Sequence, residues 1–209
     1  MTGLVFPNLE SASRAAWRTW LRANHAKAAG VWLVFLKGAS RQLTYADSVE
    51  EALCYGWIDS TMRPIDDRSY RQMFTPRRPR STWSALNKQR IGLLIADKVM
   101  AAPGLAKIEA AKKDGSWTLL DAVEAGVIPP DLARALASNK KAKAFFDASA
   151  PSSRKGALHW INNVKSPELR AKRVAHVVSQ AAKGLRPGHQ ENALARGKAA
   201  ALARKKGRV

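Results

Sequence analysis

Apolar residues near the start of the chain follow a helical spacing first and a strand-like run next. Trp17, Trp20 and Leu21 recur at i, i+3 and i+4, which predicts an amphipathic helix. The uninterrupted apolar run at 31–36, which glycines flank on both sides, predicts a buried strand. The pattern then returns to a helical period, so helix and strand alternate in this part of the chain.

Thr44 can cap the next helix because Asp47 follows it three residues later. Tyr45, Val49, Ala52 and Leu53 are expected to form the inner face of this helix, and Gly56 to end it. Two strands follow at 57–63 and 69–75, joined by a polar turn at 64–68.

Helical signals dominate the remainder of the chain. One helix is expected to start at Ser81 or Thr82 and to run to about Met100, and another to run from Pro103 to about Gly115. Four further helices are predicted between residues 129 and 184, and they are expected to start at Pro130, Asn139, Ser152 and Ser166.

These elements predict an α+β fold, with a small, mostly antiparallel sheet and helices in the N-terminal half and an all-helical C-terminal module. The expected domains are residues 1–115, a linker at 116–127, the helical module at 128–184 and a basic tail at 185–209. One core is expected to contain Trp17, Trp20, Trp32, Phe35 and Leu53. A second core is expected to contain Leu132, Phe145, Ile161 and Val177.

The net charge of +20 is concentrated in two zones. Residues 61–99 contain nine basic and three acidic side chains, and residues 151–209 contain fourteen basic and two acidic ones. Such zones attract nucleic acid, anionic lipid or acidic protein. A soluble protein with a solvated basic surface gives the same composition, so both interpretations stay open.

Several common chemistries have no signal in the sequence. Cys54 is the single cysteine, which excludes an internal disulfide and a cysteine-based metal site, and the four histidines are isolated. Nucleotide-binding glycine motifs and the Gly-x-Ser-x-Gly elbow are absent. We therefore expect no metal and no cofactor. A signal peptide and a membrane-spanning run are also absent, which makes a cytoplasmic location the expectation.

An arginine-rich segment at 59–80 is the strongest local signal of a binding site. Arg77 and Arg78 lie between two prolines and just before a predicted helix start, where guanidinium groups and exposed amides can share one phosphate or carboxylate. The candidate ligand-binding residues, which include aromatic side chains able to stack, are Trp57, Asp59, Arg63, Arg77, Arg78 and Trp83.

A structural role for these arginines is the alternative. Arg77 and Arg78 can form internal ion pairs with Asp59, Asp66 or Asp67 and so hold the predicted hairpin to the following helix. Asp66 and Asp67 themselves lie in the predicted turn, where aspartate is a common turn former.

The C-terminal tail contains a second set of candidate residues for binding nucleic acid or another polyanion. Its alanines favour a helix, but it has too few apolar residues to anchor one. Basic side chains of this kind bind phosphates without reading sequence, although a tail that only aids solubility is equally consistent. The residues are Arg196, Lys198, Arg204, Lys205, Lys206 and Arg208.

Ordered motifs along most of residues 5–184 resemble the bacterial YdeI/OmpD-associated family, named for bacteriocin protection. In the first half they are GVWLVF at 30–35, LTYADSVEEALCYGWID at 43–59, FTPRRPRSTWS at 74–84, GLAKIEAAK at 104–112 and DGSW at 114–117. In the second half they are PDL at 130–132, AFF at 144–146, PSSR at 151–154, WI at 160–161 and ELR at 168–170. The second set is similar to the family's small helical module.

The resemblance implies a role in bacteriocin or envelope-stress protection and carries no catalytic residues with it. Binding of an anionic partner at the arginine and tryptophan surface is the first expectation, with an anionic small molecule, nucleic acid or an envelope-associated protein as the candidate partner. The alternative is an enzyme that acts on a small anionic substrate near Asp59, Arg77 and Arg78. An enclosed pocket that contains Asp59 and converging arginines favours the enzyme, and an open basic face favours binding.

Overall fold

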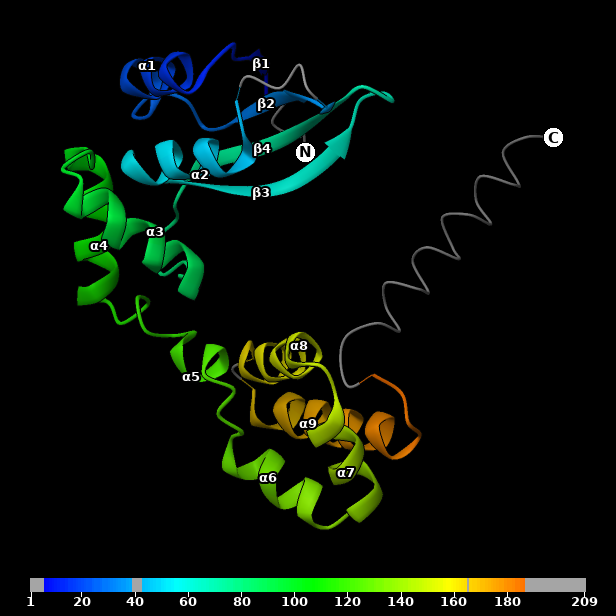
Figure 1. The fold of residues 1–209 in the computed structure, drawn as a ribbon. Helices are drawn as coiled ribbons and strands as arrows, with labels where there is room; N and C mark the ends of the chain where they lie inside the picture. Colours follow the sequence, from blue (N-terminus) through cyan, green and yellow to red (C-terminus); the bar gives the residue numbers. More distant parts are fainter. Residues whose placement is uncertain (1–5, 39–42, 165, 187–209) are drawn as a thin grey trace. The chain divides into compact units, whose positions relative to one another are not determined.

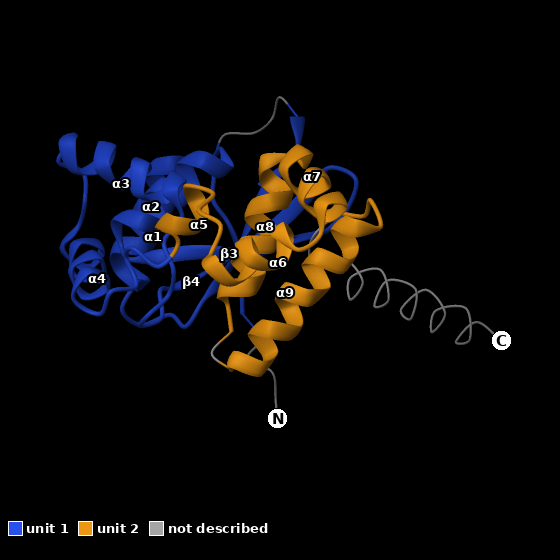
Figure 2. Cartoon of the chain, turned by 90° about the horizontal axis from the view of Figure 1, so that it is seen from below, with its two compact units in different colours: residues 1–119 blue, residues 120–209 orange. Residues whose placement is uncertain are grey.

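A computed structural model describes residues 6–38, 43–164 and 166–186 of the chain. The chain divides into two compact units, Met1–Leu119 and Leu120–Val209 (Figure 2). We refer to them as unit 1 and unit 2 and describe each by itself. The candidate basic residues of the predicted tail, from Arg196 to Arg208, lie outside the described residues.

Unit 1 contains a four-stranded sheet of order β1-β2-β4-β3 (Figure 1). The antiparallel pairs β2–β4 and β4–β3 form most of it, and β1 adds a short parallel edge that the sequence did not predict. The α+β fold with a mostly antiparallel sheet is therefore confirmed. The strands are β1 (Asn8–Glu10), β2 (Val31–Leu36), β3 (Trp57–Pro64) and β4 (Ser69–Pro76).

Four helices complete unit 1: α1 (Arg14–Asn24), α2 (Tyr45–Cys54), α3 (Ala85–Ala96) and α4 (Ala102–Lys113). Thr44 caps α2 as predicted, because its hydroxyl accepts a hydrogen bond from Asp47 N at 3.0 Å. The predicted start and end of α3 were wrong. Its cap is Ser84, residues 81–83 precede the helix, and the helix ends at Ala96.

The helices and one face of the sheet enclose the core of unit 1. Trp17, Phe35, Leu53 and Phe74 are all exposed by 2% or less, and α3 and α4 add further apolar residues to the same cluster. Trp20 is partly buried and stacks on Trp17 with the ring centroids 5.3 Å apart. The prediction that Tyr45 lies on the inner face of α2 is wrong, because its side chain is exposed.

The prediction for Trp32 is wrong in its choice of face. Successive side chains of a strand point to opposite sides, so Leu33 and Phe35 face the core whereas Trp32 lies on the other face of β2. There the guanidinium groups of Arg63 and Arg71 lie 5.4 and 4.7 Å from its ring centroid. Trp32 is buried under these arginines and does not belong to the core that contains Phe35.

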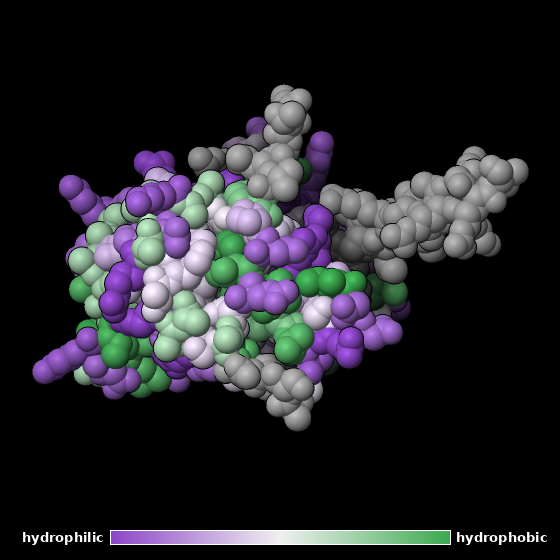
Figure 3. All heavy atoms as spheres, turned by 90° about the horizontal axis from the view of Figure 1, so that it is seen from above, coloured by the Kyte–Doolittle hydropathy of each residue, from purple (hydrophilic) through white to green (hydrophobic). Residues whose placement is uncertain are grey.

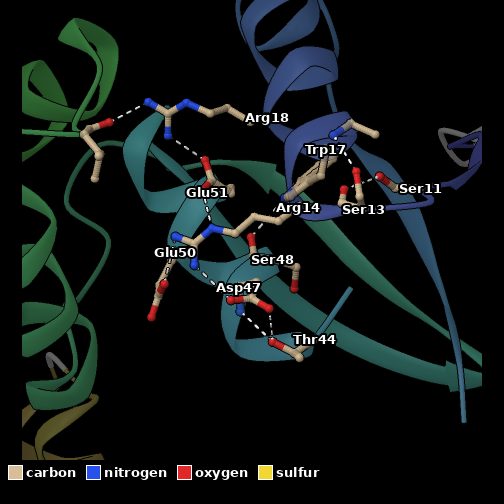
Figure 4. Close-up of polar contacts among 12 residues, drawn as sticks. Ser11, Ser13, Arg14, Trp17, Arg18, Thr44, Asp47, Ser48, Glu50 and Glu51 are labelled. Carbon is tan, nitrogen blue, oxygen red and sulfur yellow. Dashed lines mark hydrogen bonds and ion pairs between the residues drawn. The ribbon is translucent and has the colours of Figure 1, made fainter. Parts of the chain in front are cut away.

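Glu51 joins α1 to α2 within unit 1 (Figure 4). Its carboxylate accepts from Arg14 Nε and from Arg18 Nη1, both at 2.6 Å, and its side chain is only 4% exposed. Arg14 also pairs with Asp47 and Glu50, at 2.9 and 3.0 Å. Every charge in this group, which we call the Glu51 cluster, therefore has an opposite charge in contact.

Unit 2 is all helical in its described residues, which confirms the predicted C-terminal fold. Its core contains four fully buried residues: Leu132, Phe146, Ile161 and Val177. Phe145 is only partly buried and packs at the edge of this core, so the prediction of Phe145 as a core residue was wrong and the adjacent Phe146 takes that place. The helices are α5 (Asp121–Glu124), α6 (Pro130–Ala137), α7 (Lys140–Ala148), α8 (Pro151–Asn162) and α9 (Pro167–Ala182).

Two motifs that carry the family resemblance meet inside unit 2. Arg170 on α9 donates through Nε and Nη2 to the Asp131 carboxylate on α6, at 2.6 and 3.1 Å. This two-donor pair lowers the pKa of Asp131 and ties the first helix of the module to the last one. Both motif residues thus have a structural role.

Candidate functional site

The segment between β4 and α3 contains the main candidate residues. It begins where Arg77 N donates to Gly56 O at 2.9 Å, which fixes its start against the turn after α2. Arg80 has a φ of 58°, a left-handed conformation that is uncommon outside glycine. The chain therefore turns back at Arg80 before Ser84 caps α3, and no helix N-terminus lies at Ser81.

The guanidinium of Arg77 is buried against Trp83. Arg77 is 3% exposed and Trp83 is 2% exposed, and the guanidinium carbon lies 3.5 Å from the centroid of the Trp83 ring. Arg77 Nη1 donates to the carbonyl oxygen of Thr82 at 3.1 Å. Stacking and this one bond to the backbone hold the side chain in place.

Close packing of α4 on α2 forms the opposite wall. A Cβ at Gly104 would lie 2.3 Å from Cys54 O, so only glycine allows this approach of the two helices. At Gly56, with a φ of +72°, a Cβ would lie 2.6 Å from the Lys107 side chain. These two glycines therefore let α4 place Lys107 beside the segment that contains Arg77.

A cavity of about 80 Å³ lies between these walls, entirely within unit 1. We call it the Arg77 cavity. Its lining residues come from the β4–α3 segment, from α4 and from the turn after α4: Arg77, Arg78, Pro79, Arg80, Ser81, Trp83, Lys107, Ala110, Ala111, Asp114 and Ser116.

Three buried polar atoms that belong to the lining residues have no hydrogen-bond partner: Arg77 Nε, Trp83 Nε1 and Ser116 Oγ. The two nitrogens can only donate. Ser116 Oγ is weaker evidence for a missing partner, because its hydroxyl can turn toward the nearby Asp114 carboxylate. An unpaired buried donor costs about 1–3 kcal/mol, and more when the group is charged.

The charge of Arg77 is also uncompensated. Burial lowers the pKa of Arg77 to about 10, and the only opposing influence is the more distant Asp59. The guanidinium is still protonated at neutral pH, and no described acid forms an ion pair with it. Three other basic side chains line the cavity with one carboxylate, that of Asp114.

Asp114 is held by the turn that follows α4. Its Oδ1 accepts from Ser116 N at 2.9 Å. The neighbouring Ser116 hydroxyl, together with the backbone N–H groups of Ser116 and Arg80, lowers its pKa. Asp114 is therefore ionised at neutral pH and shapes the rim of the Arg77 cavity.

The structure separates the predicted site residues into three places. Arg77, Arg78 and Trp83 line the cavity together. Trp57 is a core residue whose indole N–H donates to His25 O at 3.1 Å, and Arg63 lies over Trp32 on the far face of the sheet.

Two of the three aspartates that offered internal ion pairs are engaged elsewhere. Asp59 Oδ2 accepts from the Tyr45 hydroxyl at 2.6 Å. Partial desolvation of the Tyr45 hydroxyl is the main cause that raises the pKa of Tyr45 to about 12, and Asp59 adds to it. Asp66 Oδ1 accepts from the backbone of Arg68 and Ser69 in the hairpin turn. Neither aspartate closes an ion pair with Arg77.

Sequence reasoning missed the half of the cavity that follows Gly104. Lys107, Asp114 and Ser116 line it from a part of the chain some thirty residues beyond Arg77. From the sequence, the DGSW motif at 114–117 supported the family resemblance and was not assigned to a binding site. Its turn residues gave no indication that α4 folds back onto the β4–α3 segment.

A larger hollow of about 730 Å³ lies elsewhere on unit 1. Its lining residues come from β1 and the two residues after it, from β2, from the hairpin turn and from Leu43 before α2, and none of them has an unpaired buried polar atom. Within the described residues, no group of three metal-ligating side chains lies close enough together to hold a metal ion. None of the described helices is long and apolar enough to cross a membrane. Figure 3 shows the hydropathy of one face of the molecule. The Arg77 cavity is therefore the better candidate site.

Two family models match different parts of the chain. Residues 125–184 match the model described as bacteriocin-protection, YdeI or OmpD-associated. This match covers the C-terminal part of the chain alone. Residues 9–107 match a separate model, a domain of unknown function named DUF8412. The matched family domain thus contains α6 to α9 of unit 2, whereas most of the Arg77 cavity lies in the DUF8412 region. No curated protein and no solved structure matches the chain.

Proposed function

We propose that unit 1 binds an anionic partner in the Arg77 cavity, and that this binding serves the bacteriocin-protection role for which the family of unit 2 is named. The observation that carries the proposal is that Arg77 and Trp83 line one cavity and that each has a buried donor, Nε and Nε1 respectively, without a hydrogen-bond partner. An oxyanion supplies acceptors for both donors and an opposite charge for the guanidinium.

Water alone satisfies only part of this requirement. A water molecule in the cavity can accept hydrogen bonds from Arg77 Nε or Trp83 Nε1. It leaves the buried charge of Arg77 without a counter-charge, however, and a buried unpaired charge is strongly destabilising. An anion removes both costs, which is why we favour it.

Binding is favoured over catalysis because of the position of Asp59. A general base or nucleophile must lie within hydrogen-bond reach of the bound substrate. Asp59 bonds to Tyr45 and is not among the residues that line the Arg77 cavity, and Asp114 is exposed at its rim. The cavity therefore offers groups that hold an anion, and none of its buried side chains is a carboxylate or a histidine.

Thermal unfolding with added anions tests the proposal. Phosphate, sulfate and acetate are each compared with chloride at equal ionic strength, so that screening stays constant. An anion at about 100 times its Kd stabilises the folded state by about 2.7 kcal/mol, which raises the Tm of unit 1 by about 10 °C.

Two variants give this test its control. Arg77→Met removes the charge from the cavity and keeps most of the side-chain volume, so its Tm should not respond to any of the anions. Arg22→Met removes one charge from the exposed face of α1 and should respond as the natural protein does. Equal responses of all three proteins, or no response in any, would overturn the proposal.

A further inference from the structure

We infer that the anion bound in the Arg77 cavity is a doubly charged phosphate, either free or as the terminal group of a phosphate monoester. The inference rests on the proposed anion binding and adds the chemical class of the ligand. It follows from the charge, the donor arrangement and the size of the cavity.

The charge of the lining favours a dianion. Arg77, Arg78, Arg80 and Lys107 face the cavity against a single carboxylate, Asp114. Arg77 is buried and Lys107 is half-buried, so solvent screens these two charges less than it screens the exposed rim. A monoanion neutralises one buried cation, whereas a dianion neutralises both.

The lining residues with donor groups come from three separate segments of the chain. Arg77 follows β4, Trp83 precedes α3, and Lys107 lies on α4. A carboxylate has two oxygens in one plane and matches a single arginine fork. A phosphate group presents three strong acceptor oxygens around a tetrahedral centre, which suits donors that come from different sides.

The size of the cavity limits how much of the ligand it encloses. Each ordered water needs about 10–15 Å³ of such volume, so the Arg77 cavity of about 80 Å³ has room for about five waters, or for one phosphate group. Sites that enclose whole metabolites measure about 300–1,000 Å³. The remainder of a monoester therefore lies outside, beside the exposed Arg78 and Arg80.

Calorimetric titration with four small probes tests the class: inorganic phosphate, methyl phosphate, sulfate and acetate. Methyl phosphate gains its second charge at a pKa of about 6, so below that pH its affinity should rise about tenfold per pH unit and then level off. Sulfate is a dianion at every pH of the series and should show a flat profile. No histidine lines the cavity and Asp114 stays ionised, so the lining itself adds no titration in this range.

Lys107→Met separates the dianion from a monoanion. The variant should bind phosphate and methyl phosphate at least tenfold more weakly and should change acetate binding by less than about threefold, because a monoanion is already neutralised by Arg77. Lys113→Met removes an exposed charge from the same helix outside the cavity and should leave all four affinities unchanged.

The results distinguish a wrong phosphate assignment from a failure of anion binding itself. If acetate binds as tightly as phosphate, or if methyl phosphate shows no pH dependence, the phosphate class is wrong while anion binding stands. If none of the four probes binds, anion binding itself fails. Methyl phosphate that binds within a few-fold of inorganic phosphate assigns a terminal phosphate group, and a loss of more than tenfold assigns free phosphate.

Discussion

Unit 1 contains two groups of arginines that differ in whether a carboxylate pairs with them. In the Glu51 cluster, Arg14 and Arg18 converge on one buried carboxylate, at 2.6 Å each (Figure 4). In the Arg77 cavity, the guanidinium is more deeply buried and has no carboxylate in contact among the described residues. The first group is electrostatically complete within the chain, whereas the second group is not.

The difference indicates what each group contributes. Opposite charges in the Glu51 cluster offset one another, so the cluster holds α1 to α2 and requires nothing from outside. Arg77 is stabilised by stacking on Trp83 and by one backbone carbonyl, which leaves its charge and its Nε–H without a partner. A buried charge of this kind is costly unless a ligand pairs with it.

Loss of the central carboxylate should have the largest effect on stability. Glu51→Gln leaves Arg14 and Arg18 without their shared acceptor. It should lower the free energy of unfolding by about 2–3 kcal/mol, somewhat less than for a fully buried pair because both arginines can still reach water. Glu50→Gln removes one partly exposed partner of Arg14 and should cost under about 1 kcal/mol. Chemical denaturation of both variants measures the two values, and equal losses would contradict the central place of Glu51.

Acid should weaken the Glu51 cluster through Asp47. The Thr44 hydroxyl, assisted by Arg14, lowers the pKa of Asp47 in the folded protein. A lowered carboxyl pKa adds stability above the unfolded-state value, and this stability is lost as the pH falls through the folded-state value. Asp47→Asn should therefore cost about 1 kcal/mol at neutral pH, and the stability curves of variant and natural protein should converge in acid. Parallel curves down to the acid limit would exclude this linkage.

Arg77→Met should change the stability of the anion-free protein by less than about 1 kcal/mol, in either direction. The substitution loses the stacking on Trp83 and the bond to Thr82, but it also removes an unpaired buried charge. Denaturation in chloride buffer measures the effect. A loss as large as that of Glu51→Gln would mean that Arg77 is fully paired within the chain.

Of these substitutions, Asp59→Asn should have the smallest effect. It tests whether the Tyr45 hydroxyl is the hydrogen-bond partner of the Asp59 carboxylate. The pKa of Tyr45, which is about 12, should fall toward the ordinary value but not reach it, because partial desolvation is the larger cause. Ultraviolet titration of the natural protein and the variant, each compared with its Tyr45→Phe form, measures the shift. An unchanged Tyr45 pKa would return Asp59 to the list of partners for Arg77.

Local signals in the sequence predicted most helices and strands correctly. Thr44 caps α2, and Gly56 follows its end with a positive φ, because capping depends on residues a few positions apart. The core prediction for Trp32 was wrong because a run of apolar residues does not show that the two faces of a strand are buried by different partners. Phe145 failed for a similar reason, since one residue of register separates it from the core position of Phe146.

The candidate site was predicted only in the part that is local in sequence. Arg77, Arg78 and Trp83 were found because the segment is dense in donors and aromatic rings. Lys107 and Ser116 were missed because their placement depends on the approach of Gly104 to Cys54, a contact between distant parts of the chain. The lack of an acid beside Arg77 also needed the fold, since three aspartates lie close to it in sequence.

The indole N–H signal of Trp83 in a two-dimensional ¹H–¹⁵N spectrum tests the central claim most directly. Trp83 lines the Arg77 cavity and its Nε1 is a buried donor without a partner, and the other six of the chain's seven tryptophans give indole signals that serve as internal references. Trp83→Phe assigns the signal. Titration with phosphate at constant ionic strength should shift the Trp83 signal in a saturable way and leave the buried Trp57, which donates to His25, unmoved. The shift should be absent in Arg77→Met. If the Trp83 signal does not move at phosphate concentrations that saturate every other change in the spectrum, the result would contradict anion binding in this cavity.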